Sequence, residues 1–402
     1  MLNSVDSAVL GKPKLLLCIP LWGREYIAEW LQWSWASLSS QRNLPAVADE
    51  FDVSVQIVTR QADCEEIREG FKDLQINEQV RIEVLPLLAH ELPNKYTAMT
   101  TAVLASMNIA ARERAIFVFS GADFIWSDGS LRFLASQLRS KRAVFNWAGI
   151  VDRQSATIEL MKFRHGGVLQ IESRALARIL LNNNHPLQES WIVGENLVPK
   201  SPWCAIWLSP DSECAVIRSH APTPTGINFD RFSQSTLNTY LGLLRRFVLD
   251  SAETFEPLLG DGSEIVIVSD SDELLVASLD SADREPPPPE RAVCKAGASG
   301  TTFLSYLAKY QRLQCYISKY LFTKPYILHT GELDDWSKSQ ILICQNQLIL
   351  HLAGETRTSV MARLWFLLPS LRWRQRVSSI VLPVLATIRK VYAMKPNRIG
   401  MR

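Results

Sequence analysis

The 402-residue sequence lacks the glycine-rich phosphate loops of the common nucleotide-binding folds. It has no G-x-G-x-x-G after its first predicted strand, which ends at Pro20, and no G-x-x-x-x-G-K-[ST] anywhere. These motifs place backbone N–H groups around a diphosphate. Dinucleotide oxidoreductases and P-loop nucleotidases are therefore poor interpretations, and a nucleotide, if one binds, must be held by other groups.

The sequence also lacks paired cysteines and long apolar runs. Its seven cysteines are scattered and form no C-x-x-C pair, so they suggest neither a disulfide framework nor a zinc site and favour a reducing, cytoplasmic location. Residues 1–14 have neither the charged start nor the apolar core of a signal peptide. No run reaches the roughly 20 apolar residues that cross a bilayer.

Acidic residues are missing from the end of the chain. Ten of the 43 Lys and Arg residues and no Asp or Glu follow Glu355, so the first 355 residues carry 33 basic and 41 acidic side chains. An acidic body argues against a nucleic-acid partner, which needs a basic footprint. In 356–402, basic residues alternate with Trp365, Trp373 and aliphatic residues. This pattern predicts contact with an anionic membrane surface on its inner face, with a solvated basic face as the alternative.

Hydrophobic patterns in residues 14–148 alternate between strands and helices. Strands are predicted at 14–20, 51–59, 81–88, 115–119 and 143–148, and helices at 25–38, 64–72, 96–111 and from 130 onward. This alternation predicts an α/β fold with a mostly parallel sheet flanked by helices.

The stretch from Ala115 to Arg132 ends a buried strand in two spaced carboxylates. Asp123 should lie in the loop beyond the strand, at the edge of an α/β sheet where ligands bind. Asp128 precedes Gly129 and a helix, so helix N-capping is the preferred interpretation.

The later chain divides into three further segments. Residues 151–280 contain short elements, including a helix at 173–182, a strand ending at His220, a helix at 236–248 and one long strand at 264–279. Four consecutive prolines mark 281–300 as a linker, and 301–402 reads as a mainly helical, basic extension.

Four segments together resemble the nucleotide-sugar-binding half of GT-A glycosyltransferases: KLLLCIPLWGREYIAEWLQWSWASL, IVTRQAD, NKYTAMTTAVLASMNIA and FVFSGADFIWSDGSL. The resemblance covers roughly residues 14–150, with 151–280 as the acceptor-side half of the same domain. In that family a D-x-D motif holds a divalent metal on the diphosphate of the sugar donor. The matching triplet here, Gly121-Ala122-Asp123, lacks the first Asp, which weakens the expectation of metal dependence.

The resemblance implies a nucleotide-diphosphate sugar donor, with Mg²⁺ or Mn²⁺ as a metal cofactor. It implies Pro20 and Trp22 near the nucleotide, Asp63 near the base, Lys95 near the phosphates or base, and Asp123 at the metal or sugar.

Three further side chains are candidates by their chemistry. His220 could contact a metal or diphosphate or serve as a structural histidine. Glu189 and Glu195 lie in the acceptor-side segment, and either could be the base that an inverting transfer needs.

These features favour a glycosyltransferase that acts on a glycan or lipid-linked acceptor in cell-surface polysaccharide or glycoconjugate synthesis. The alternative is a catalytically impaired carbohydrate-binding or scaffold protein tethered to a membrane. A nucleotidyltransferase is a weaker option, since PLWGRE offers only one Gly and one Arg after the first strand.

Overall fold

A computed structural model provides the three-dimensional structure of the chain. It describes residues 11–72, 74, 77–87, 95–193, 197–199, 204–219, 223–245, 254, 257–258, 263–281, 291–293, 325–333, 335–336 and 338–339. Within these residues, no helix is both long enough and apolar enough to cross a membrane.

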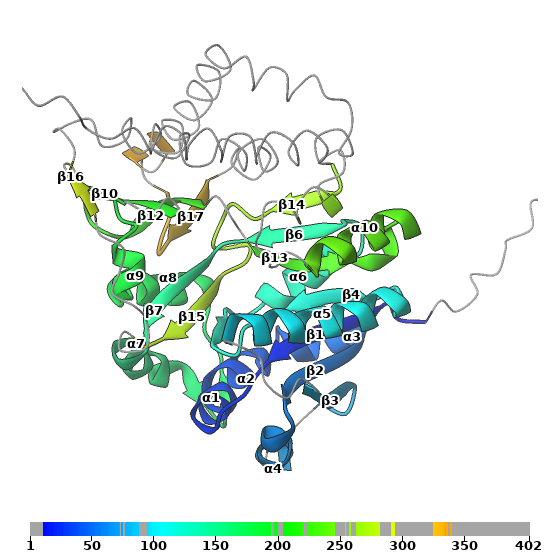
Figure 1. Ribbon diagram of the computed structural model, residues 1–402. Helices are drawn as coiled ribbons and strands as arrows, with labels where there is room; N and C mark the ends of the chain where they lie inside the picture. The colour runs from blue at the N-terminus through cyan, green and yellow to red at the C-terminus, as the bar shows by residue number, and fades with distance from the viewer. Residues whose placement is uncertain are drawn as a thin grey trace, which may run out of the picture. The chain divides into compact units, whose positions relative to one another are not determined.

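A seven-stranded sheet forms the centre of the fold, in the order β14-β6-β13-β4-β1-β2-β3 (Figure 1). Pairing is parallel throughout except for β13, which runs antiparallel to both β4 and β6. The strands are β1 (Lys14–Pro20), β2 (Asp52–Arg60), β3 (Val80–Leu87), β4 (Ile116–Phe119), β6 (Ala143–Asn146), β13 (Thr223–Asn228) and β14 (Ile265–Ile267). The predicted mostly parallel α/β sheet is confirmed.

Helices cover both faces of this sheet because the central strands β1 and β4 are apolar on both sides. In β1, Leu15, Leu17 and Ile19 pack into one core cluster, while Leu16 and Cys18 pack into the other. The first cluster includes residues of α1 (Arg24–Glu29), the π-helix η1 (Trp30–Ser34), α2 (Trp35–Leu38), α3 (Leu44–Glu50), α4 (Cys64–Lys72) and α6 (Ser130–Leu138). The second includes residues of α5 (Lys95–Glu113) and α10 (Gln234–Leu244).

A smaller sheet, with the strand order β5-β15-β7, lies next to the carboxyl ends of β1 and β4. Its strands are β5 (Phe124–Trp126), β15 (Val276–Asp280) and β7 (Ala148–Asp152). The single long strand expected at 264–279 is wrong, because β14 and β15 belong to different sheets and the polar turn 269–273 separates them. Asp270 and Asp272 lie in this turn.

The remaining strands form peripheral sheets. β11 (Cys204–Leu208), β12 (Cys214–Ser219) and β17 (Tyr326–His329) form an antiparallel sheet, β8 (Arg164–His165) pairs with β9 (Val168–Leu169), and β10 (Leu197–Pro199) pairs with β16 (Arg291–Val293). β16 thus lies inside the segment expected to be a linker, and β17 inside the segment expected to be mainly helical. Other helical elements are η2 (Gln61–Asp63), α7 (Arg153–Leu160), η3 (Met161–Phe163), α8 (Ser173–Asn182), α9 (Pro186–Glu189) and η4 (Phe229–Arg231).

A row of buried polar side chains fixes the segment 120–131, which follows β4. The polar row consists of Ser34, Ser37, Ser40 and Asn43, spaced three residues apart and each no more than 2% exposed. Ser34 Oγ donates to the Ala122 carbonyl at 2.7 Å. The Trp126 N–H donates to Ser37 Oγ at 3.1 Å. These bonds satisfy backbone groups that have no strand partner, which buried segments require.

Asp128 belongs to this network, and its predicted N-cap role is wrong. Its carboxylate accepts hydrogen bonds from Ser40 Oγ at 2.8 Å and from the Arg42 N–H at 3.3 Å. The N-cap residue of α6 is Gly129, whose φ of 94° suits glycine. Asn43 Oδ1 instead accepts hydrogen bonds from the N–H groups of Gly129 and Leu131 at the start of α6. The helix is therefore capped by a residue distant in sequence.

Replacement of Asn43 by Ala should destabilise the protein by about 2–4 kcal/mol, because four buried partners lose their hydrogen bonds. Those partners are the carbonyls of Ser37 and Ser127 and the N–H groups of Gly129 and Leu131. Urea unfolding measures the change. The matched control, Asn238→Ala at an exposed position of α10, should stay within about 0.5 kcal/mol of wild type. Equal effects of the two variants would contradict the role given to the polar row.

Candidate functional site

A pocket of about 270 Å³ lies beyond the carboxyl ends of β1 and β4. Its lining residues are Pro20, Trp22, Tyr26, Met99, Phe119, Gly121, Ala122, Asp123, Leu279 and Asp280. The structure therefore brings three of the predicted site residues together, from the first strand and its loop and from the loop after β4. In open α/β sheets this edge is where ligands bind.

Asp123 is fixed in this pocket by β15. Ser278 Oγ donates a hydrogen bond to the Asp123 carboxylate, and the Leu279 N–H donates to the Asp123 carbonyl at 2.8 Å. The carboxylate is half-buried. Because both its side chain and its backbone are held, Asp123 presents its charge to the pocket in a defined direction.

Asp280 supplies a second carboxylate, which the sequence analysis missed. It ends β15 and lines the same pocket as Asp123, although 157 positions separate the two in the sequence. The only local signal was an acidic residue at the end of an apolar strand. Its neighbour in space depends on the antiparallel pairing of β15 with β5, which no short motif encodes.

Gly121 lies where there is little room for a side chain. A Cβ atom at this position would lie 2.7 Å from Asp123 Oδ1 and 2.8 Å from the Phe124 ring. Both distances are far shorter than a normal van der Waals contact. A side chain at 121 would therefore displace Asp123 or Phe124.

Most of the other lining residues are apolar or aromatic. Tyr26 and Met99 are 40% and 38% exposed, which is high for side chains of this size, and Trp22 lies between β1 and α1 in sequence. A pocket with apolar walls and a few converging polar groups is typical of small-molecule sites. The arrangement suits a ligand with a flat, stackable ring at one end and, at the other, hydroxyl groups or a cation that carboxylates can bind.

Asp63 lies next to the loop after β1 but does not line the pocket. Its carboxylate accepts from the Gly23 N–H at 3.0 Å and from Arg60 Nε at 2.7 Å, and Gly23 has a φ of 88°. Burial opposes ionisation of Asp63, but the hydrogen bonds from Arg60 and Gly23 outweigh it and lower the pKa of this carboxyl. Asp63 thus shapes the loop that carries Trp22.

The other predicted site residues are not brought to the pocket by the described part of the chain. Glu189 is exposed at the end of α9 and is not among the lining residues. Lys95 begins α5, but its side chain lies outside the described residues, as do Glu195 and His220 entirely.

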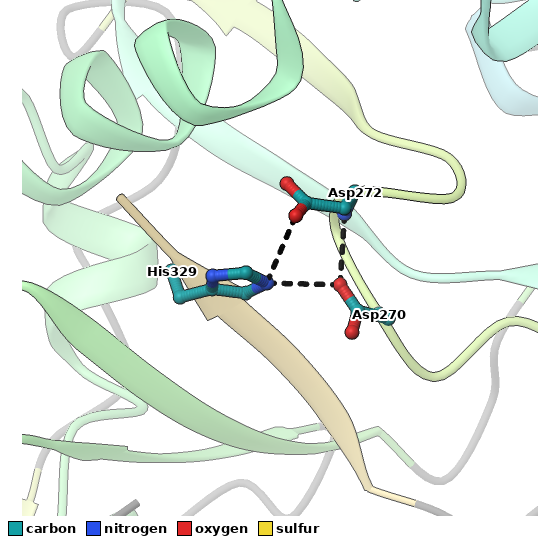
Figure 2. Close-up of side chains that lie close together, drawn as sticks. All are labelled: Asp270, Asp272 and His329. Atoms are coloured by element: carbon teal, nitrogen blue, oxygen red, sulfur yellow. Dashed lines mark hydrogen bonds and ion pairs between the residues drawn. The ribbon is translucent and has the colours of Figure 1, made fainter. Parts of the chain in front are cut away.

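A separate group of ligand-type side chains, the Asp–Asp–His cluster, consists of Asp270, Asp272 and His329. Figure 2 shows the His329 ring pointing from β17 toward the turn that carries both acids. His329 Nε2 lies 2.9 Å from Asp270 Oδ1 and 3.9 Å from Asp272 Oδ2. The hydrogen bond between them raises the pKa of His329 and lowers that of Asp270. None of the three lines the pocket.

Replacement of Asp63 by Asn should lower stability by about 1 kcal/mol at pH 7, because the ion pair with the half-exposed Arg60 is lost. The folded-state pKa of Asp63 is depressed, so its contribution is complete above the unfolded value of about 3.9 and disappears as the pH falls below it. The difference between variant and wild type should therefore shrink from pH 5 to pH 2 in thermal melts. Asp49→Asn, at an exposed carboxylate of α3, should show no such trend; a constant difference for Asp63→Asn would contradict the assignment.

No protein-family model and no curated protein matches the chain. Among solved structures, two crystal structures of S. aureus TarS are similar, both at 13% identity. The longer gives a TM-score of 0.30 over 89% of this chain and 46% of TarS, and the 1–349 form gives 0.33 over 90% and 77%. GalNAc-T7 with UDP, GalNAc and Mn²⁺ is similar at 10% identity and a TM-score of 0.36, over 82% of this chain and 54% of GalNAc-T7. This chain thus spans about half the length of the longer TarS structure and of GalNAc-T7. Likeness at this level does not establish function, which has to be inferred from the pocket.

Proposed function

We propose that the protein is a glycosyltransferase that transfers a sugar from a nucleotide-diphosphate donor to a hydroxyl of a glycan or lipid-linked acceptor. The observation that carries the proposal is the convergence of Asp123 and Asp280 with Trp22 and Tyr26 in one pocket at the carboxyl edge of the sheet. A donor of this class has a flat base, a diphosphate and a sugar. The aromatic side of the pocket would receive the base, and the acidic side would receive the diphosphate and sugar.

The pocket acids fit a divalent metal cofactor. Mg²⁺ commonly binds proteins through one or two carboxylates, with substrate phosphates and waters as the other ligands. Asp123 and Asp280 provide that number, and they would hold Mg²⁺ or Mn²⁺ in the place where the family resemblance implies a D-x-D motif. When bound, the ion would neutralise charge on the departing diphosphate.

The transfer itself requires a base and a stabilised leaving group. The acceptor oxygen forms a bond to the anomeric carbon of the sugar, the bond from that carbon to the diphosphate oxygen breaks, and the base takes the hydroxyl proton. Glu189 and Glu195 are the proposed candidates for the base, from the acceptor-side segment. Lys95 and His220 are proposed to contact the diphosphate, where positive or hydrogen-bonding groups oppose the developing charge.

Asp123→Asn and Asp280→Asn should each lower kcat/KM for sugar transfer by at least about 100-fold, which corresponds to about 2.7 kcal/mol of transition-state stabilisation. Asn can still accept the hydrogen bond from Ser278, so folding should be retained. A panel of radiolabelled nucleotide sugars and acceptor extracts provides the assay. Asp49→Asn is the matched control with unchanged activity. Absence of transfer, of hydrolysis and of any donor-induced rise in melting temperature in wild type would refute the proposal.

A scaffold or carbohydrate-binding role is the second candidate, favoured by Gly121, which leaves the family's acidic motif incomplete. The two functions differ in what Asp123→Ala does in cells. A folded Asp123→Ala protein that still complements a deletion strain would support the scaffold. Loss of complementation with folding intact would support the enzyme.

We also propose that residues 356–402 hold the protein on the inner face of an anionic membrane, where the acceptor would be found. Ten basic residues without an acidic one would each add about 1 kcal/mol of attraction to anionic lipid near the surface. Truncation after Glu355 should abolish cosedimentation with vesicles of 30 mol% phosphatidylserine at about 0.15 M salt. Continued sedimentation of the truncated chain would contradict this role.

A further inference from the structure

The Asp–Asp–His cluster contains three side chains that can each bind a metal ion, whereas a structural ion pair needs only two side chains. One ligand atom from each of Asp270, Asp272 and His329 lies within 4.8 Å of the other two. We propose that the cluster binds a divalent transition-metal cation of the Mn²⁺ or Zn²⁺ type, separately from the pocket. The bound ion would connect the turn between β14 and β15 to β17.

The orientation of His329 supports this proposal. Its Nδ1 is hydrogen-bonded to the Gly331 carbonyl, and since a carbonyl can only accept, Nδ1 must carry a proton. Nε2 faces both acids and shares its proton with Asp270 (Figure 2). A cation that displaces this proton would leave a neutral ring, with the Nε2 lone pair directed at the ion. Metal-binding histidines are commonly held in this way by a backbone carbonyl on the other ring nitrogen.

The distances are close to those of a metal site. Ligands about 2.0–2.1 Å from a tetrahedral ion lie about 3.3–3.4 Å from one another. The distances from His329 Nε2 are 2.9 Å to Asp270 Oδ1 and 3.9 Å to Asp272 Oδ2. Changes of about half an ångström in each would place both oxygens at the required separation. The Asp272 N–H already donates to Asp270 Oδ1 at 2.8 Å, so the two acids are held together by their own turn.

Charge and access also favour a dication. Asp270, Asp272 and Glu332 contribute three negative charges, and Arg174, which donates to Asp272 and Glu332, contributes one positive charge. Around a neutral imidazole this leaves two negative charges, which one divalent ion cancels. The His329 side chain is 5% exposed, whereas those of Asp270 and Asp272 are 35% and 38% exposed. An ion can therefore enter from solvent and keep water at its open positions.

The ligand set also indicates selectivity. An imidazole nitrogen binds first-row transition metals better than Mg²⁺ or Ca²⁺, which prefer oxygen ligands. Mn²⁺ is the best probe for an experiment, because it has little affinity for the thiols of the seven cysteines. Excess Mg²⁺ should not displace it.

Electron paramagnetic resonance of Mn²⁺, titrated into the full-length chain without nucleotide, tests the proposal. One ion should bind to wild type and equally to Asp123→Asn/Asp280→Asn, in which the pocket acids are removed. His329→Gln and Asp272→Asn should each weaken binding at least tenfold. His165→Gln, at an exposed histidine of β8, is the matched control and should bind as wild type does. A 100-fold excess of Mg²⁺ should leave the bound fraction unchanged.

Two results would overturn the proposal: no Mn²⁺ binding by wild type, or binding that His329→Gln and Asp272→Asn leave intact. Loss of binding only in Asp123→Asn/Asp280→Asn would place the ion in the pocket instead. Circular dichroism of each variant establishes that it is folded, and Asp272→Asn keeps the His329–Asp270 hydrogen bond in case His329→Gln unfolds. Because no nucleotide is present, the outcome is independent of whether the protein transfers sugars.

Discussion

The site depends on the hydrogen bonding of one segment outside the central sheet, which runs from the end of β4 through β5 into the first turn of α6. Residues 120–131 follow β4 along the edge of the hydrophobic core. An unpaired backbone N–H or C=O group would cost about 1–3 kcal/mol there. The polar row satisfies them from the adjacent helical region. Since Asp123 lies in this segment, its position is set by serines about 90 residues earlier in the chain.

β15 provides the second constraint. It adds a strand to β5 immediately after Asp123, and the Leu279 N–H and Ser278 Oγ both bond to that residue. The same strand ends in Asp280. Thus one element orients the first acid of the pocket and supplies the second. The pairing of β15 with β5 thus brings together two acids that lie far apart in the sequence.

The sequence predicted the central sheet well because its signals are local. The apolar runs of β1, β2 and β4 and the turn residues after them each lie within about ten positions, and from them Asp123 could be placed at the edge of the sheet. Pro20 and Trp22 were expected there only from the family resemblance, and all three line the pocket. The sequence did not predict Asp280, because its importance comes from strand pairing over more than 150 positions. The polar turn within 264–279 was overlooked since apolar residues flank it on both sides.

Asp128 illustrates a different limit. An acid followed by glycine and a helix favours N-capping by local rules, but Asn43 satisfies the same N–H groups from another segment and leaves Asp128 to bind Ser40. The capping of α6 is therefore determined by a tertiary contact and not by the local sequence preference. The Asp–Asp–His cluster has the same origin, since His329 meets its partners only through the pairing of β17 with β12 and its contact with the turn at Asp270.

Binding of a nucleotide-diphosphate donor through Asp123 and Asp280 is best tested by a crystal structure of the full chain with a nucleoside diphosphate and Mn²⁺. With anomalous data collected at the manganese edge, we expect a peak between the diphosphate and these two acids, with the base against Trp22. A nucleotide bound elsewhere, or an empty pocket at saturating nucleotide, would contradict it.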